Sequence, residues 1–260
     1  MNESQIRRPT PIRSRARGYS LIEVMIALAV ALFLLAGIVL VEQGTHQTSL
    51  NQSGLAKLQD EERMAMTILA NVVQQAGYYP TPATLIPANE LILALPATGS
   101  LQAGQGVYGQ TDANGNEILT VRFLTNAGDG VLNCQGSGNT SGAPLEYDNT
   151  FAVDNTNHQL TCSVNGGAAV PLINNVQSIS VLYGVNSGTT TLFDNSGAVD
   201  AYLTSTQVTG NAAAKTFWTN IYTVKITVTF INPLAGQPGQ PATIAFTRVM
   251  GLKARTGVNV

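Results

Sequence analysis

The chain has 260 residues, of which 44% are hydrophobic and only 11% are charged. This length suffices for one large domain or two small ones with a real core. The net charge of −2 conceals an asymmetry, because residues 1–18 hold five of the 13 Lys and Arg but one of the 15 Asp and Glu. Residues 19–260 are therefore mildly acidic, which argues against binding nucleic acid through bulk electrostatics, and no nucleic-acid partner is predicted.

A basic leader followed by a long apolar run opens the chain. The leader contains five arginines, which are Arg7, Arg8, Arg13, Arg15 and Arg17. As a helix, residues 19–41 are about 35 Å long, enough to cross a bilayer. The arginines predict a cytoplasmic N-terminus and an exported remainder. No Ala-x-Ala cleavage site follows the run, so a permanent signal anchor is one interpretation.

A single carboxylate, Glu23, interrupts this apolar run near its start. An ionisable group in a membrane-spanning segment costs several kcal/mol unless it finds a partner. Glu23 therefore marks a functional position that a simple anchor does not explain.

No proline occurs between Tyr19 and Gly77, which predicts one long helix that ends near this glycine. Residues 19–45 form its hydrophobic, transmembrane part and residues 46–77 its amphipathic part. The apolar stripe of the second part consists of Leu55, Leu58, Ala65, Leu69, Val72 and Ala76. A coiled coil is a competing interpretation, but the repeat is short and broken, so packing on the chain's own domain is favoured.

Residues 78–260 change to alternating, strand-like patterns. The clearest predicted strands are 117–125, 176–183, 221–231 and 243–250, with weaker candidates at 91–95 and 160–164. Half-buried strands in succession, without helices between them, predict an antiparallel sheet covered on one face. The expected fold class is α+β, with a long N-terminal α-helical spine packed on a mainly antiparallel β-sheet head.

Two cysteines, Cys134 and Cys162, lie in the exported part. An even count in an oxidising compartment favours a disulfide, although two buried free thiols are the alternative. Closing a loop of this length would stabilise the fold by about 3 to 4 kcal/mol on the chain-entropy model. The cysteines and the distant His46 and His158 do not have the spacing of a zinc site, so no metal or cofactor is predicted.

The remaining motifs that suggest chemistry are weak. Gly104-x-Gly106-x-x-Gly109 matches a dinucleotide fingerprint by letters, but it follows no convincing strand and opens no helix, which indicates a loop. The segment 112–116 begins like a calcium loop, yet Glu117 occupies the glycine position, so a hairpin turn is favoured over a calcium site. No catalytic set is evident, and a membrane-anchored enzyme is disfavoured.

The segment 17–28, with the sequence RGYSLIEVMIAL, resembles the class III signal of type IV pilins and of type II secretion pseudopilins. The resemblance implies that prepilin peptidase cuts between Gly18 and Tyr19, removing the leader 1–18. The same enzyme would then methylate the new amine of Tyr19, which stands where most members have Phe. Glu23 corresponds to the carboxylate that neutralises the N-terminal amine of a neighbouring subunit and so sets the subunit register.

Further segments resemble PilW-type minor pilins, namely 58–63, 74–78, 119–123, 132–136, 160–162, 176–185, 199–202 and 218–225. The resemblance implies a non-enzymatic precursor in the inner membrane, with a periplasmic head, that later joins the pilus at the cell surface. Its implied partners are prepilin peptidase, other minor pilins and the major pilin through the N-terminal helices, and a tip adhesin. The implied role is priming and assembly of pili, supporting twitching motility and adhesion; a minor pseudopilin of type II secretion is the alternative.

Overall fold

A computed structural model describes residues 18–80, 95–188, 198–211 and 213–254. The leader up to residue 17 and residues 91–94 of a predicted weak strand lie outside these ranges. The chain divides into two compact units, Met1–Gln52 and Ser53–Val260, which are described separately below.

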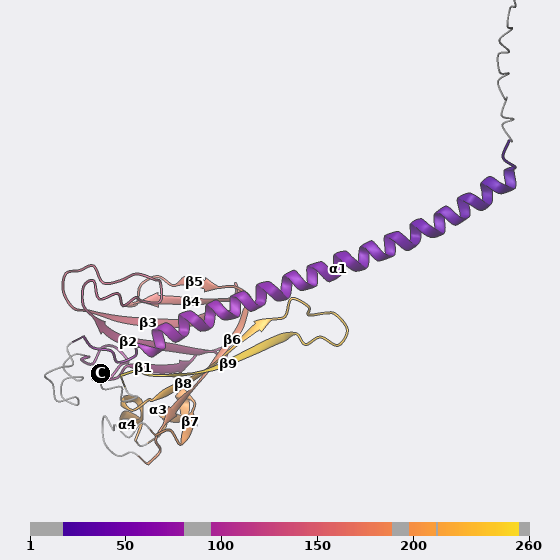
Figure 1. Ribbon diagram of the computed structural model, residues 1–260. Coiled ribbons are helices and arrows are strands. Elements are labelled where there is room, and N and C mark those ends of the chain that lie inside the picture. Colours follow the sequence, from indigo (N-terminus) through magenta and orange to yellow (C-terminus); the bar gives the residue numbers. More distant parts are fainter. Residues whose placement is uncertain (1–17, 81–94, 189–197, 212, 255–260) are drawn as a thin grey trace, which may run out of the picture. The chain divides into compact units, whose positions relative to one another are not determined.

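Helix α1 (Leu21–Gln74) begins in the first unit and ends in the second (Figure 1). Its 54 residues confirm the prediction of one long helix. Gly77, just beyond its end, has φ +74°, a conformation that glycine adopts without a Cβ penalty. The Gly77 N–H donates to the Arg122 carbonyl at 2.9 Å, which joins the helix end to the head.

The part of α1 that belongs to the second unit packs on its own domain, as predicted. The buried members of the predicted stripe are Leu58, Ala65, Leu69, Val72 and Ala76. Met66, Ala70 and Val73 are also buried and widen the stripe, whereas Leu55 is half-buried. This wide apolar face is typical of a helix that covers a core rather than of a narrow coiled-coil seam.

The head contains two antiparallel sheets rather than the single sheet that the sequence predicts. The first has the order β1-β2-β3-β4-β5. Its strands are β1 (Val107–Thr111), β2 (Glu117–Thr125), β3 (Leu145–Asp154), β4 (Gln159–Val164) and β5 (Val170–Ile173). Consecutive strands pair as a meander, with Leu119 opposite Phe151 and Phe151 opposite Cys162.

The second sheet has the order β7-β6-β8-β9. Its strands are β6 (Val176–Val185), β7 (Ala201–Leu203), β8 (Thr223–Ile231) and β9 (Thr243–Gly251). Two short helices, α3 (Ser205–Thr209) and α4 (Ala214–Thr219), separate β7 from β8, so the expectation of strands without intervening helices is wrong here.

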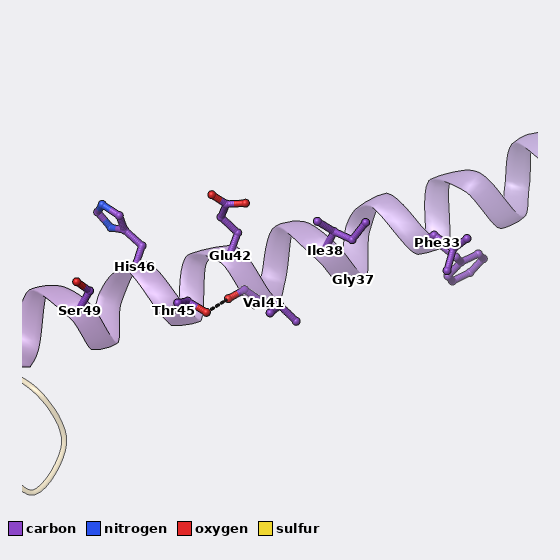
Figure 2. Close-up of a pocket in the computed structure, with 9 residues that line it drawn as sticks. Phe33, Gly37, Ile38, Val41, Glu42, Thr45, His46 and Ser49 are labelled. Atoms are coloured by element: carbon purple, nitrogen blue, oxygen red, sulfur yellow. Dashed lines mark hydrogen bonds between the residues drawn. The ribbon is translucent and has the colours of Figure 1, made fainter.

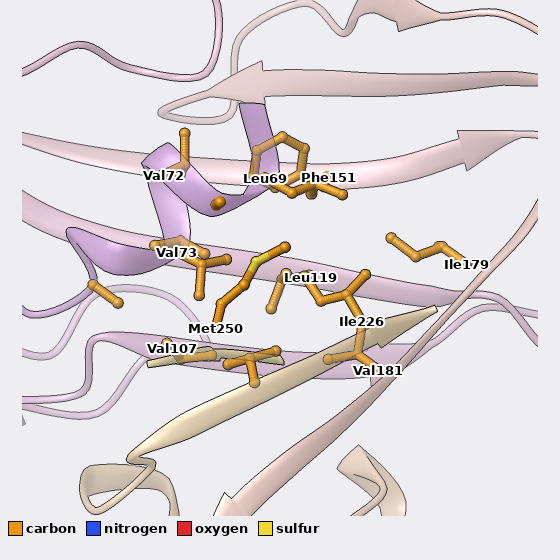
Figure 3. Packing of buried hydrophobic residues seen from close by; sticks show 14 of the residues in the cluster. Leu69, Val72, Val73, Val107, Leu119, Phe151, Ile179, Val181, Ile226 and Met250 are labelled. Carbon is orange, nitrogen blue, oxygen red and sulfur yellow. The ribbon is translucent and has the colours of Figure 1, made fainter. Parts of the chain in front are cut away.

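The core of the head lies where α1 meets both sheets (Figure 3). Leu69 and Val73 of the helix belong to one buried cluster with Leu119 of β2, Ile226 of β8 and Met250 of β9. Both sheets therefore contribute to one hydrophobic core, and β8, whose burial alternates residue by residue, presents Val224, Ile226, Val228 and Phe230 to it.

Candidate processing and assembly site

The predicted cleavage position lies ahead of the first helical turn. Gly18 and Tyr19 are exposed and precede α1, and the Ser20 carbonyl accepts the N–H groups of Glu23 and Val24 at 3.0 and 3.2 Å. Ser20 is therefore the N-cap of α1, whose first helical residue is Leu21. A peptide bond outside the helix is accessible to a peptidase, so the geometry accommodates the predicted cut between Gly18 and Tyr19.

Glu23 lies in the first turn of α1, near the positive end of the helix dipole. Its side chain is exposed, and neither ion pair among the described residues includes it: these pairs are Lys57–Glu61 and Arg122–Glu146. The described part of this single chain thus supplies no cation for Glu23, and its predicted partner on another subunit stays a prediction. The sequence analysis did not identify Ser20 as the N-cap, although Ser-x-x-Glu is a common pattern at the N-terminus of a helix.

The first-unit part of α1 presents apolar side chains on every side. All residues from 21 to 50 are exposed, including Phe33, which is 83% exposed, and Leu40, which is 69% exposed. The helix is long and apolar enough to cross a membrane. An exposed apolar surface of this extent indicates a segment that requires lipid or other helices around it.

A shallow depression on this part of the helix surrounds Gly37 (Figure 2). Phe33, Ile38 and Val41 line its apolar end, whereas its other end is polar and includes Glu42 and His46. Because Gly37 lacks a side chain, another helix can approach the backbone closely there. The polar end shows where the purely apolar segment stops.

The disulfide between Cys134 and Cys162 is present, with Cα atoms 6.3 Å apart. It joins the segment that follows β2 to strand β4. The Cys134 N–H donates to the side chain of buried Asn149 on β3 at 2.8 Å, and the Gln135 side chain donates to the Cys162 carbonyl at 3.2 Å. The disulfide therefore anchors a segment without regular structure to the first sheet.

The glycines that match a nucleotide fingerprint have structural roles. Gly104 has φ +75°. A Cβ atom on Gly106 would overlap the backbone of Gly77, and one on Gly109 would overlap the side chains of Tyr183 and Glu117. Gly106 and Gly109 therefore allow other parts of the head to lie directly against the backbone, and the segment leads into strand β1 rather than into a helix.

The segment that begins like a calcium loop forms the turn between β1 and β2. Asp112 Oδ1 accepts the N–H groups of Asn114 and Asn116, both at 2.8 Å. Its oxygen is thus used by the turn itself, as in other Asx turns. Among the described residues, no group of three His, Cys, Asp or Glu side chains is arranged to hold a metal ion.

Arg122 is buried, although it alternates in β2 with Val121 and Phe123, which belong to the hydrophobic core. Its guanidinium donates to the carbonyls of Pro96, Gln102 and Gln105 at 2.6, 2.7 and 2.9 Å. Burial lowers the pKa of Arg122, and the charge of Glu146, whose carboxylate lies 3.8 Å away, opposes this effect. The buried cation fixes residues 96–105 against the first sheet.

Comparisons with known families agree with both parts of this description. Residues 13–39 match the prokaryotic N-terminal methylation motif, and residues 145–244 match the family described as Type IV Pilus-assembly protein W, or PilW. No curated protein matches the chain. Among solved structures, the chain is similar to the type IV-like pilin TTHA1219 from Thermus thermophilus, with 13% identity and a TM-score of 0.41; the similarity covers 76% of this chain and 98% of that one.

The methylation motif at the start of an exposed apolar helix, together with the antiparallel β head, defines a type IV pilin-like protein. Within that class, the chain carries a PilW family domain in its head. Pilins are structural proteins, and the family is not known to be enzymatic.

Proposed function

We propose that this chain is a minor type IV pilin of the PilW kind, which takes part in priming and assembling type IV pili and thereby supports twitching motility and adhesion. The observation that carries the proposal is the combination, in one chain, of the methylation motif on an exposed apolar helix and the PilW family domain. A membrane anchor needs only the apolar helix, whereas an assembling subunit needs the whole motif.

The precursor is held in the inner membrane as a single-pass protein with a cytoplasmic N-terminus and a periplasmic head. Prepilin peptidase removes the leader 1–18 by cutting between Gly18 and Tyr19, and the new Tyr19 amine is methylated. Residues 19–45 then leave the lipid for the helical core of the filament, residues 46–77 continue the helix, and residues 78–260 form the head. The exposed apolar surface of residues 21–41 is suited both to the lipid bilayer and to the helical core of a filament.

Glu23 sets the register between subunits during this transfer. Its carboxylate finds no cation among the described residues of its own chain, and a low-dielectric surrounding penalises any unpaired charge. The N-terminal amine of a neighbouring subunit carries the complementary charge. Pairing the two removes the penalty at one axial position only, which selects that register over others.

The partners in this proposal are prepilin peptidase, other minor pilins, the major pilin and a tip adhesin. Contacts with the pilins run through the N-terminal helices, and the depression around Gly37 offers one place of close approach. The chain itself performs no catalysis and needs no cofactor.

Deletion of this chain in its native host tests the proposal. We expect loss of surface pili and of twitching motility, restored by the wild-type chain, with secretion of exoproteins unchanged. Normal piliation together with loss of secreted exoproteins would instead identify a minor pseudopilin of type II secretion.

A further inference from the structure

Glu117, the first residue of β2, is a buried carboxylate whose partners are hydroxyl groups. It is 5% exposed. Tyr183 of β6 donates to its Oε1 at 2.8 Å, while Ser205 of α3 and Thr111 of β1 donate to its Oε2 at 3.0 and 3.4 Å. Neither ion pair among the described residues involves Glu117. One carboxyl group thus joins the first sheet to the second through neutral donors.

The surroundings of this group are closely packed. Tyr183 is fully buried, and its ring lies 4.9 Å from that of Trp218. Gly109 of β1 passes so near that any Cβ atom there would overlap both the Tyr183 hydroxyl and the Glu117 carboxylate. Backbone and aromatic rings therefore enclose the carboxyl group, and its ionised form loses hydration that three hydroxyls only partly replace.

Among the residues whose side chains the structure describes, the titratable groups that face Glu117 are two tyrosines. Tyr183 comes from β6 and Tyr108 from β1, while residues 205–209 of α3 and 216–219 of α4 contribute none. Burial, followed by the charge of Glu117, raises the pKa of Tyr183 well above its usual value, so this tyrosine remains a hydrogen-bond donor. Burial also raises the pKa of Glu117, and hydrogen bonds from the three hydroxyls oppose this effect.

We propose that Glu117 is a proton-linked clamp between the two sheets, which hold together most firmly when this carboxyl group is neutral. A carboxyl group that binds its proton more tightly in the folded than in the unfolded chain stabilises the fold fully at low pH. That stabilisation is lost as the pH rises through the pKa of the folded state. Protonation of Glu117 at low pH thus stabilises the head. A carboxylate paired with a cation has the opposite effect, because its protonation at low pH breaks the ion pair and destabilises the fold. The proposal concerns the head alone and does not depend on the function proposed above.

The test compares the full-length chain with its E117Q variant in detergent micelles. The amide of E117Q keeps the shape of the carboxyl group and stays neutral at every pH. Trp218, the single tryptophan, reports denaturant unfolding beside Tyr183. For each protein, the measured quantity is the equilibrium ratio of folded to unfolded chain. This ratio for E117Q, divided by the ratio for wild type, should rise between pH 4.5 and pH 8.5. The total rise is about tenfold for each unit by which the pKa of Glu117 in the folded chain exceeds that in the unfolded chain. A constant ratio, or one that falls with pH, would overturn the proposal.

Two further variants make the result independent of how well E117Q folds. Tyr183→Phe removes one hydrogen-bond donor to Glu117, and the ionised carboxylate depends on that donor more than the neutral carboxyl group does. The variant should therefore destabilise the head more at pH 8.5 than at pH 4.5. An equal loss of unfolding free energy at both pH values would contradict the proposed role of Glu117. Glu62→Gln removes a carboxyl group on α1 outside the cluster. It serves as the matched control and should show no comparable rise with pH.

Discussion

The side-chain amide of Asn175 donates to both carboxylate oxygens of Glu61, at 3.1 and 3.0 Å. Asn175 has φ +59° and lies between β5 and β6, where the chain passes from one sheet to the other. Glu61 belongs to α1, and Lys57 lies 3.8 Å from its carboxylate. This contact therefore joins the helix to the crossing point between the two sheets.

We expect Asn175→Asp to destabilise the head by about 1 to 3 kcal/mol, because it replaces a donor to a carboxylate by a second carboxylate. Asn175→Gly is the matched variant: it removes the same hydrogen bonds, adds no charge and suits the positive φ. Asn175→Gly should therefore lower the free energy of unfolding by less than Asn175→Asp does. Denaturant unfolding of both variants at pH 7 measures the difference, and equal stability of wild type and Asn175→Asp would show that the contact contributes nothing.

Replacing Cys134 and Cys162 together by Ser should lower the free energy of unfolding by about 2 to 5 kcal/mol. The disulfide holds an irregular segment to β4, and its removal gives the unfolded chain more additional conformational freedom than the folded chain. Wild-type protein unfolded under reducing conditions provides the control and should match the double variant. If the oxidised wild type and the double variant unfold at the same denaturant concentration, the disulfide does not stabilise the head.

Gly109→Ala should destabilise the head by several kcal/mol, because the added methyl group would overlap Tyr183 and Glu117. Gly138→Ala is the matched control, since its Cβ would meet the Leu132 side chain at an ordinary 3.5 Å. In thermal unfolding, the melting temperature should fall strongly for Gly109→Ala and change little for Gly138→Ala. Similar stabilities for both would mean that β1 can move away from the Tyr183–Glu117 pair at little cost.

Gly18→Trp should block processing without disturbing the described structure, because no atom lies within 4 Å of a Cβ built on Gly18. An uncut precursor should then accumulate on an immunoblot. Gly37→Ala, whose added Cβ also meets nothing, should be processed normally. A mature-sized Gly18→Trp chain would refute the assignment of the cleavage site.

Glu23→Val should be cleaved and inserted into the membrane but enter filaments poorly, because it lacks the carboxylate that pairs with a neighbouring amine. Glu42→Gln, which neutralises the next carboxylate on the same helix, is the control and should assemble. Incorporation of Glu23→Val at the wild-type level, measured against the amount of mature protein, would eliminate the proposed pairing.

The elements that the sequence predicts correctly are those whose own pattern determines them. In β8, polar and apolar residues alternate from Thr223 to Phe230, and the predicted strand 221–231 differs from the observed Thr223–Ile231 only at its start. The strand β3 escaped prediction because buried Asn149 interrupts its apolar face, where the amide meets Cys134 and Val121 rather than solvent. The short β1 contains Gly109, a residue that ordinarily weakens a strand.

Other features depend on partners far away in the sequence. Arg122 is buried because carbonyls of residues 96–105 surround it. Glu117 is buried because Tyr183 of β6 and Ser205 of α3 contact its carboxylate. The division into two sheets likewise depends on the turn at Asn175. For the assembly site, the roles of Gly18, Tyr19 and Glu23 are implied by the resemblance of segment 17–28 to the class III signal and stay predictions, and the partner predicted for Glu23 belongs to another subunit.

The most direct test of the proposed function is mass spectrometry of pili sheared from the native host. We predict peptides of this chain in the filament fraction, including one that begins at Tyr19 and carries a methyl group on its amine. Such a peptide demonstrates cleavage, modification and incorporation together. Filaments without this chain, or a chain that retains residues before Tyr19, would contradict its assignment as an assembled minor pilin.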